Sequence, residues 1–571
     1  MNIRIICVAL ALCLFASYAS FAAESEKLAF PKVKEGKILE DNWYHIFVGT
    51  TKVGYINIKV TKTNCDGEPC LLFDIKEIVR IKDGDKVLER EEVERILVSG
   101  ESLRPMYYAR NISAPKSEYS KISMVEKKDG SWVLKTQVSV NGENEERTRT
   151  FSGVDEVYFE QTIGWLYRLK YLKEKKNVEI LVFDLEEDKI EPEACEYEGE
   201  VVEGEGEDAV TFDVVCLGEE RHWYDGDGIL ARKIEGGGFL GGLLTDEKTA
   251  KDFSAVREGY KIPGGFKDGV LTVKELGIKM ESPVDSVFIF PATMKGIQAI
   301  VGIDAIRRSG FVVISFFGVP KGTKYEDALE KVKKMFKESE IGPGKMRDAG
   351  KNKCMTGSFK KGKGLEAESG EYHLFVLDDR VVLFIPKGRS GTYENSKKEL
   401  TGCVDSIEFF KPEFDKDKLL FIDKKTGLQF QLPNPGWNVM VAEGEGREHF
   451  LIANLWTEAF VIGQIQPPWK NITPEQALER LLQKFEAKAS GKTRIGKYDA
   501  VWLDAEMLKG ERMMGIRMTF IMRENDVVAV SMAVWKESWE SMKPDFDAVS
   551  ESFDFPEEEN DDGKETPDAK E

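Results

Sequence analysis

Alternating apolar and polar residues dominate the first part of the chain. Between residues 41 and 153, segments such as WYHIFVG, KVGYINIKVTKT and LLFDIKEIVRI are rich in β-branched and aromatic residues, and turn signals such as KDGD and NGEN separate them. Alternation with period two places one face of each strand against a core and the other in water. The pattern predicts an antiparallel meander.

One helical segment interrupts this series of strands. In EQTIGWLYRLKYLKEKK, the residues Ile163, Leu166, Leu169 and Leu172 recur at a spacing of three, which is typical of an amphipathic helix. Strand patterns resume with VEILVFDL and continue towards residue 258. We therefore expect an antiparallel β-domain over residues 41–258, with its helix on the concave face of the sheet.

From residue 268 onward the chain repeats one pattern. GIKMESP at 277 matches GLQFQLP at 427, EDALEKVKKMF at 326 matches EQALERLLQKF at 475, and HLFVLDDRVVLF at 373 matches TFIMRENDVVAV at 519. The offset between the copies shrinks steadily along the chain, as small loop deletions would produce. The pattern predicts a duplicated domain, repeat 1 at 268–411 and repeat 2 at 418–556.

Each repeat is expected to hold an internal helix and a C-terminal helix among its strands. Thr323 with Glu326, and Thr473 with Gln476, have the spacing of a capping box at the start of the internal helix. In the second copy Pro474 occupies the first helical position, where proline is favoured.

The second copy also resembles a known family. GLQFQLPNPGWNV, ITPEQALERLLQKF and a closing SFDF motif resemble the PsbP-like fold over residues 421–556. This resemblance implies an antiparallel sheet sandwiched by helices, as in non-catalytic accessory and binding proteins. Repeat 1 is similar more loosely, since Trp437 has no counterpart in it.

The first domain resembles exported LolA-like β-domains. YHIFVGTTKVGYINIKV and the closing WYDGDGILARKIEGGGF carry the resemblance, which implies an apolar ligand held between curved sheet and helix. Together the patterns predict an α+β multidomain chain. An antiparallel β half-barrel with a covering helix comes first, and two duplicated α/β-sandwich (PsbP-like) domains follow it.

The N-terminus has the pattern of a secretory signal peptide. Arg4 precedes an apolar run, and Ser20-Phe21-Ala22 fits the small-x-small cleavage rule. We expect a signal peptide at 1–22, cleavage near Ala22, a linker at 23–40, and a periplasmic or extracellular protein. No later stretch has the length of a transmembrane helix. The acidic tail at 557–571 lacks apolar residues and is expected to be disordered.

Charge and compartment then restrict the possible partners and the state of the cysteines. A net charge of −20 disfavours nucleic acid as a partner. Six cysteines remain after export, an even number that predicts three disulfides in an oxidising compartment. The predicted pairs are Cys65–Cys70 across a turn, Cys195–Cys216 across a hairpin, and Cys354–Cys403.

Cys354 is the residue whose surroundings most resemble an active site. It lies in NKCMTGSFKKGKG, among lysines that could lower its pKa, and His373 and Asp378 follow. One interpretation is a thiol-dependent, transglutaminase-like acyl transferase. The other is a structural disulfide, because Cys354 and Cys403 align with Ala500 and Val549, so that both partners change together between the copies. We favour the disulfide and predict no catalytic residues.

The tryptophans are distributed unevenly. Repeat 2 holds six of the ten and repeat 1 holds none. Trp469, Trp535 and Trp539 are possible ligand-contacting residues, since exposed aromatic rings stack on sugars or peptides. We favour the other interpretation, that most of the tryptophans of repeat 2 belong to the core.

These features predict an exported, non-catalytic binding or structural protein of the cell envelope that engages a protein, lipid or envelope component. The four histidines lack metal-ligand spacing and no Cys-x-x-Cys occurs, so we predict no metal and no cofactor. The alternatives are the acyl transferase at Cys354 and a carrier of an apolar ligand in the N-terminal half-barrel.

Overall fold

The structure is a computed structural model that describes residues 28–48, 51–83, 86–204, 209–218, 220–235, 240–252, 266–267, 270–281, 287–294, 297–304, 306–307, 309–389, 391–414, 417–423, 425–434, 436–440, 448–454 and 456–555. The predicted signal peptide, the start of the predicted linker and the predicted acidic tail lie outside the described residues.

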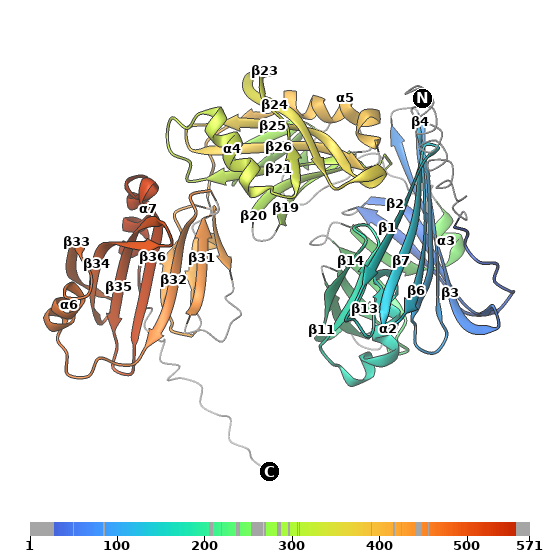
Figure 1. The fold of residues 1–571 in the computed structure, drawn as a ribbon, viewed down its shortest axis with the longest axis horizontal. Coiled ribbons are helices and arrows are strands. Elements are labelled where there is room, and N and C mark those ends of the chain that lie inside the picture. The colour runs from blue at the N-terminus through green and yellow to red at the C-terminus, as the bar shows by residue number, and fades with distance from the viewer. Residues whose placement is uncertain are drawn as a thin grey trace, which may run out of the picture.

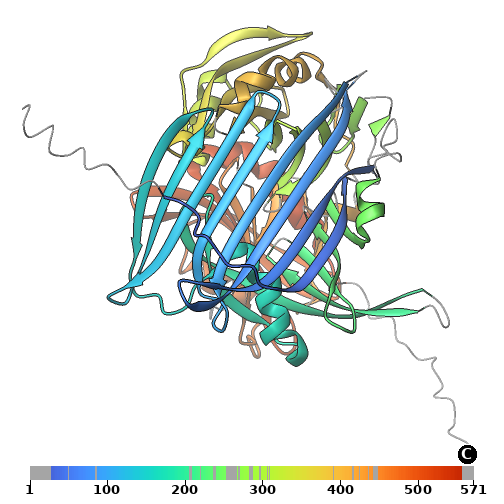
Figure 2. The same ribbon diagram turned by 90° about the vertical axis from the view of Figure 1, so that its right-hand side faces the viewer.

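The N-terminal domain is one open sheet of fifteen described strands, whose long strands face the viewer in Figure 2. Its strand order is β8-β7-β6-β5-β4-β3-β2-β1-β15-β14-β13-β12-β11-β10-β9, and β9 and β10 run parallel whereas the other neighbours are antiparallel. The strands are β1 (Lys37–Val48), β2 (Thr51–Cys65), β3 (Glu68–Asp83), β4 (Lys86–Ser99), β5 (Pro105–Ala114), β6 (Ser117–Lys128), β7 (Ser131–Val140), β8 (Glu143–Phe151), β9 (Tyr158–Phe159), β10 (Val178–Asp184), β11 (Lys189–Glu203), β12 (Val210–Leu217), β13 (Glu220–Tyr224), β14 (Leu230–Glu235) and β15 (Leu240–Thr245).

Short helices accompany this sheet. They are the 3-10 turn η1 (Glu160–Thr162), α2 (Ile163–Lys170), the 3-10 turn η2 (Leu172–Glu174) and α3 (Glu247–Lys251). The sheet curls around α2, so that strands from both of its halves share one core with the helix. Near the two ends of the sheet, Phe183 of β10 packs edge-on against Trp132 of β7, with ring centroids 6.2 Å apart.

Repeat 1 contains a four-stranded and an eight-stranded sheet in the described residues. Its elements are β16 (Phe266–Lys267), β17 (Val270–Val273), β18 (Ile278–Glu281), β19 (Val287–Met294), β20 (Ile297–Asp304), β21 (Ser309–Phe317), α4 (Tyr325–Met335), β22 (Ser339–Ile341), β23 (Lys345–Ala349), β24 (Asn352–Lys361), η5 (Gly364–Glu366), β25 (Glu368–Val376), β26 (Arg380–Arg389), α5 (Thr392–Asp405) and β27 (Glu408–Phe409). The larger sheet packs on α5 with one face and on α4 with the other.

The described part of repeat 2 contains a two-stranded and a seven-stranded sheet. Its elements are η6 (Asp417–Leu419), β28 (Leu420–Ile422), β29 (Gln429–Gln431), β30 (Trp437–Met440), β31 (Glu448–Asn454), β32 (Ala459–Gln466), α6 (Pro474–Leu482), β33 (Ala487–Ile495), β34 (Tyr498–Lys509), β35 (Arg512–Met522), β36 (Val527–Trp535), η7 (Lys536–Ser538) and α7 (Trp539–Glu551).

The two larger sheets share one strand order. It runs β19-β20-β21-β26-β25-β24 in repeat 1 and β30-β31-β32-β36-β35-β34 in repeat 2. Their registers agree as well, because His373 lies opposite Thr356 and Phe384 in repeat 1. In repeat 2 Thr519, which the sequence alignment matches to His373, lies between the residues matched to those two.

The predicted fold class is wrong. Strands make up 59% and helices 16% of the structure, so the chain is mostly β and not α+β. The described helices are short, whereas hydrogen-bonded strands run on into large sheets. A half-barrel with a covering helix describes the N-terminal domain only loosely, since its strands form one open sheet that continues past the helix.

Of the two predicted capping boxes, the one in repeat 2 is present and the one in repeat 1 is not. Thr473 and Gln476 form the predicted capping box, with Pro474 at the first helical position. Thr323 does not cap α4, because its hydroxyl donates to the Pro320 carbonyl and the helix begins later, with Lys324 as its N-cap. None of the helices in the described ranges has the length and apolarity needed to span a membrane.

Repeat 1 lies between the N-terminal domain and repeat 2, as Figure 1 shows. It touches the N-terminal domain through Phe288 and Ile306, which pack against apolar ends of β1, β2 and β3, and also through the loop between β24 and β25. It touches repeat 2 through Phe316, whose ring centroid lies 5.4 Å from that of Trp456. Repeat 1 therefore contacts each neighbouring domain through side chains of its strands and turns.

Candidate functional site

Cys354 and His373 lie in an apolar core. Cys354 on β24 and His373 on β25 are both completely buried, and Asp378 lies on the exposed turn between β25 and β26. Burial raises the pKa of the Cys354 thiol, and burial lowers the pKa of His373 to about 3. Neither ring nitrogen of His373 has a hydrogen-bond partner in the described part of the chain. A thiolate–imidazole pair oriented by Asp378 is not assembled.

Cys403 on α5 shares this core with Cys354. Both are completely buried in one apolar cluster beneath α5. The matched residues Ala500 and Val549 are likewise completely buried in one cluster beneath α7 of repeat 2. All six cysteines are free thiols in the structure, so the bond between Cys354 and Cys403 stays a prediction.

Cys65 and Cys70 lie on one face of the hairpin formed by β2 and β3. They flank the Asp66-Gly67 turn, with Cys65 opposite Glu68 and Cys70 opposite Thr63. A disulfide between them stays a prediction.

The predicted Cys195–Cys216 pair is wrong. Cys195 lies opposite Leu217, and Cys216 opposite Glu196, one residue away from the predicted register. Directly opposed residues share a face. Cys195 therefore points into the core and Cys216 points to the other face.

The tryptophans of repeat 2 mostly pack within the protein. Trp469, Trp535 and Trp539 are each half-buried. Trp469 lies against Phe520 and Trp539 against Phe546, with centroids 5.4 and 5.7 Å apart. Trp456 is buried against repeat 1. The ligand-contacting role of Trp469, Trp535 and Trp539 stays a prediction.

Trp535 lies close to the contact between the two repeats. Its indole N–H donates to Glu458 at 2.6 Å, and the Arg512 guanidinium lies 3.9 Å from the ring centroid. Glu458 also pairs with Lys331 of α4, at 3.9 Å. The sequence favoured core positions for most of these tryptophans, and two of the rings, Trp456 and Trp535, lie at or near the junction between the repeats.

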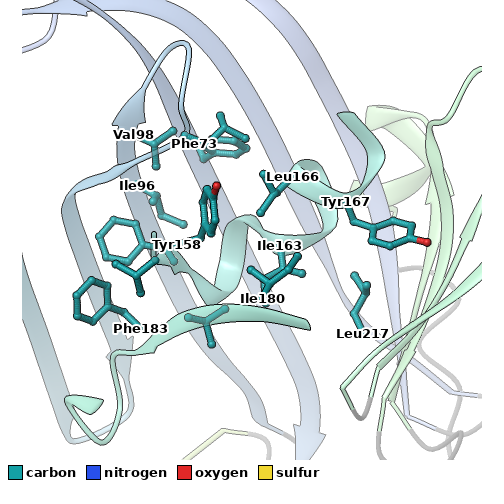
Figure 3. Packing of buried hydrophobic residues seen from close by; sticks show 14 of the residues in the cluster. Phe73, Ile96, Val98, Tyr158, Ile163, Leu166, Tyr167, Ile180, Phe183 and Leu217 are labelled. Carbon is teal, nitrogen blue, oxygen red and sulfur yellow. The ribbon is translucent and has the colours of Figure 1, made fainter. Parts of the chain in front are cut away.

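The inner face of the N-terminal sheet is occupied by its own helix. Figure 3 shows Ile163 and Leu166 of α2 among side chains of the surrounding strands, including Phe73, Ile96 and Ile180. Leu166 is completely buried. The space in which the LolA-like resemblance places an apolar ligand is therefore filled by the helix along this stretch.

Glu220, His222 and Tyr224 of β13 form a hydrogen-bonded chain that ends on this helix. His222 on β13 is buried, and its Nε2 lies 2.9 Å from Glu220 while its Nδ1 lies 3.2 Å from the Tyr224 hydroxyl. That hydroxyl donates to the Gly164 carbonyl of α2. Burial acts to raise the pKa of Glu220, but the hydrogen bond to His222 and the ion pair with Lys233 lower it to about 2. Burial raises the pKa of Tyr224, so the group at the end of this chain is a poor nucleophile.

A hollow of about 540 Å³ lies at a β-bulge of the N-terminal sheet. The register between β11 and β12 shifts between Tyr197 and Gly199, and bulges re-aim side chains at functional sites. Tyr197 and Trp223 line the hollow together with Arg221. The indole of Trp223 is largely covered by cations, since the Arg232 guanidinium lies 4.2 Å from its ring centroid.

Ion pairs and exposed apolar residues surround this hollow. Glu198 pairs with Arg221, and Glu203 with Arg232, each at 2.6 Å. The adjoining β11–β12 hairpin exposes Val201, Val202 and Val210 by 41, 62 and 46%. Sequence reasoning missed this surface, although the acidic run EYEGEVVE interrupted by apolar residues was a visible signal. No three His, Cys, Asp or Glu side chains are gathered to hold a metal ion within the described ranges.

Comparisons with known proteins identify no family for this chain. No family model matches this chain, and no curated protein matches it. Solved structures similar to parts of it include PsbP-like, envelope-associated and immunity proteins.

Three of these structures illustrate the range of similarity. The cyanobacterial PsbP of Synechocystis sp. PCC 6803 is 16% identical with a TM-score of 0.19, over 24% of this chain and 91% of its own. LpqN, involved in cell envelope biogenesis of Mycobacterium tuberculosis, is 11% identical with a TM-score of 0.20, over 24 and 90%. The T6SS immunity protein TplEi of Pseudomonas aeruginosa is 9% identical with a TM-score of 0.14, over 47 and 97%. Values this low identify no specific protein and transfer no function.

Proposed function

We propose that this chain is an exported, non-catalytic binding protein that engages another protein through the hollow at Tyr197 and Trp223 and the adjoining β11–β12 hairpin. The observation that carries the proposal is the chemistry of this surface. Tryptophan, tyrosine and arginine dominate the binding energy of protein interfaces. Here they lie beside Val201 and Val210, which are exposed on the same face of the hairpin as the hollow.

Charge favours a partner segment that is cationic as well as apolar. Four exposed glutamates of β11 and Asp213 face three cations, Lys175, Arg221 and Arg232. The surface therefore carries a surplus of negative charge, in line with the net charge of −20. Complementary charge speeds association and selects partners.

The other two functions have less support. An acyl transferase needs a reachable thiolate, whereas Cys354 is completely buried and has a raised pKa. A carrier of apolar ligands needs an open interior, whereas α2 occupies the inner face of the sheet.

Fluorescence anisotropy with three labelled ten-residue peptides tests the proposal on the purified mature chain. One peptide contains Lys and Leu, one Lys and Ser, and one Glu and Leu. We expect the Lys–Leu peptide to bind most tightly. The double substitution V201S/V210S should weaken that binding by about tenfold or more, because it removes the apolar contact on the face of the hollow.

Val87 supplies the matched control. It is 68% exposed on β4, so V87S removes an exposed valine away from the hollow and should leave binding unchanged. Equal binding of all three peptides, or an unchanged affinity of V201S/V210S, would contradict the proposal. Turnover of a peptide, ester or glycan substrate that C354A abolishes would contradict its non-catalytic part, and a copurifying lipid in mass spectrometry would favour the carrier.

A further inference from the structure

A short loop of repeat 1 inserts against the inner face of the N-terminal sheet. It joins β24 to β25 and contains η5, and both Gly362 and Gly364 have left-handed backbone angles, with φ of +83° and +68°. A Cβ atom at Gly364 would lie 2.1 Å from a carboxylate oxygen of Glu145. The left-handed turn therefore favours glycine at 364, and a larger residue there would also displace the Glu145 side chain.

The Glu366 carboxylate at the end of this loop is surrounded by donors of the N-terminal domain. Lys121 Nζ lies 3.0 and 3.2 Å from its two oxygens, and the Tyr119 hydroxyl and the Arg147 guanidinium also donate to it. The side chain of Glu366 is 11% exposed. Burial acts to raise the pKa of Glu366, but Lys121, Tyr119 and Arg147 lower it below its usual value.

These donors are held in place by the N-terminal domain itself. Lys121 is 2% exposed and donates to the Leu185 carbonyl and, at 3.4 Å, to Asp188. Arg147 Nε lies 3.2 Å from the same Asp188 carboxylate. Two cations thus share the buried Asp188 carboxylate, Arg147 also lies 3.8 Å from Glu145, and Glu366 is the carboxylate that reaches both cations from the other domain. Leaving a buried charge without a partner is costly.

The residue before Glu366 fills an apolar depression beside this site. Leu365 packs against Ile112, Tyr119, Val138 and Val140, and its backbone N–H donates to Glu145 at 2.6 Å. The loop therefore presents an apolar and an acidic side chain to two adjoining pockets, as a short bound peptide does.

We propose that Tyr119, Lys121 and Arg147 form a receptor for a carboxylate that follows an apolar residue in a tight turn. Glu366 occupies this receptor from within the chain, and an acidic peptide of the same chemistry competes for it. Other contacts also join the two domains, since Phe288 and Ile306 pack against valines and isoleucines and Arg389 pairs with Glu186. These contacts do not use Leu365 or Glu366, so the loop can leave the receptor while they persist.

A peptide supplied in trans tests this proposal on the full mature chain. The variant L365A/E366A empties the receptor, and the labelled peptide KKGKGLEAES copies residues 360–369. We expect this peptide to bind the variant at least about tenfold more tightly than the wild type, whose own loop is present at high effective concentration. The same peptide with Gln in place of the glutamate at position 366 should bind the variant at least about tenfold more weakly.

Asp378 gives the matched control, because it lies on the exposed turn that follows the next strand of repeat 1. The variant D378A should bind the peptide as poorly as the wild type does. Circular dichroism checks that each variant is folded. Equal binding to wild type and L365A/E366A, equal binding of the Glu and Gln peptides, or no binding to the folded variant at millimolar peptide would each overturn the proposal.

Discussion

His373 makes repeat 1 sensitive to acid at a position where repeat 2 has a threonine. Its ring is completely buried and packs edge-on against Phe384, with centroids 6.2 Å apart. Burial, followed by the charges of Arg347 and Lys397, lowers its pKa to about 3. The matched residue in repeat 2 is Thr519, so H373T replaces an ionisable group with the residue that the same fold uses elsewhere.

The size of the effect follows from the two pKa values. A histidine in an unfolded chain has a pKa of about 6.5, whereas His373 in the folded state has a pKa of about 3. As the pH falls below about 6.5, the unfolded state takes up a proton that the folded state does not. Stability is therefore full above that pH and is lost at about 1.4 kcal/mol per unit, which gives about 2 kcal/mol at pH ~5 and about 5 kcal/mol at pH ~3.

Hydrogen exchange with mass spectrometry measures this loss locally, because repeat 1 contains no tryptophan. Peptides that cover β25 and β26 should lose about 2 kcal/mol of opening free energy between pH ~7.5 and pH ~5, after correction for the intrinsic exchange rate. In H373T the same peptides should lose much less, and peptides that cover β35 around Thr519 serve as the internal control. An equal loss in the wild type and in H373T would refute the assignment to His373.

Three further predictions concern packing. If Cys354 and Cys403 form a disulfide, thiol labelling of the denatured, unreduced protein should leave both cysteines unlabelled, and labelling of both would contradict the bond. The variant C354A/C403V should lower the free energy of unfolding of repeat 1 by roughly 3–5 kcal/mol. W456A removes the packing on Phe316 and should cost about 3–5 kcal/mol, seen in calorimetry as a lower transition for one repeat; an unchanged scan contradicts this contact. L166A should cost the N-terminal domain about 2–5 kcal/mol in urea, and a cost below about 1 kcal/mol contradicts the filled interior.

Local chemistry made much of the strand pattern predictable. The turns expected at KKDGS and NGEN are hairpin turns in which Asp129 and Gly130, and Asn141 and Gly142, have positive φ. Asparagine, aspartate and glycine tolerate that conformation, and such pairs mark two-residue hairpins. The capping box at Thr473 was predictable for the same reason, since all of its partners lie within three residues.

Register was less accessible to sequence reasoning. The predicted pairing of Cys195 with Cys216 assumed one register along the whole hairpin, whereas Glu203 lies opposite Val210 near the turn and Cys195 lies opposite Leu217 beyond the bulge. A shift of one position moves a side chain to the opposite face. The bulge between Tyr197 and Gly199 also adds an unpaired residue to β11. A bulge leaves no reliable mark in the pattern of apolar and polar residues.

The ionic contact at Glu366 shows what a strand pattern can still reveal. Tyr119, Lys121, Ser123 and Val125 alternate on β6, and all four are buried. Period two therefore placed a lysine on the core face, beside residues that pack inward. A charge in that position requires an opposite charge to cover it, although the sequence does not say from where. Here it comes from a loop 245 residues further along the chain, so a cation on the core side of a strand is evidence for a distant acidic partner.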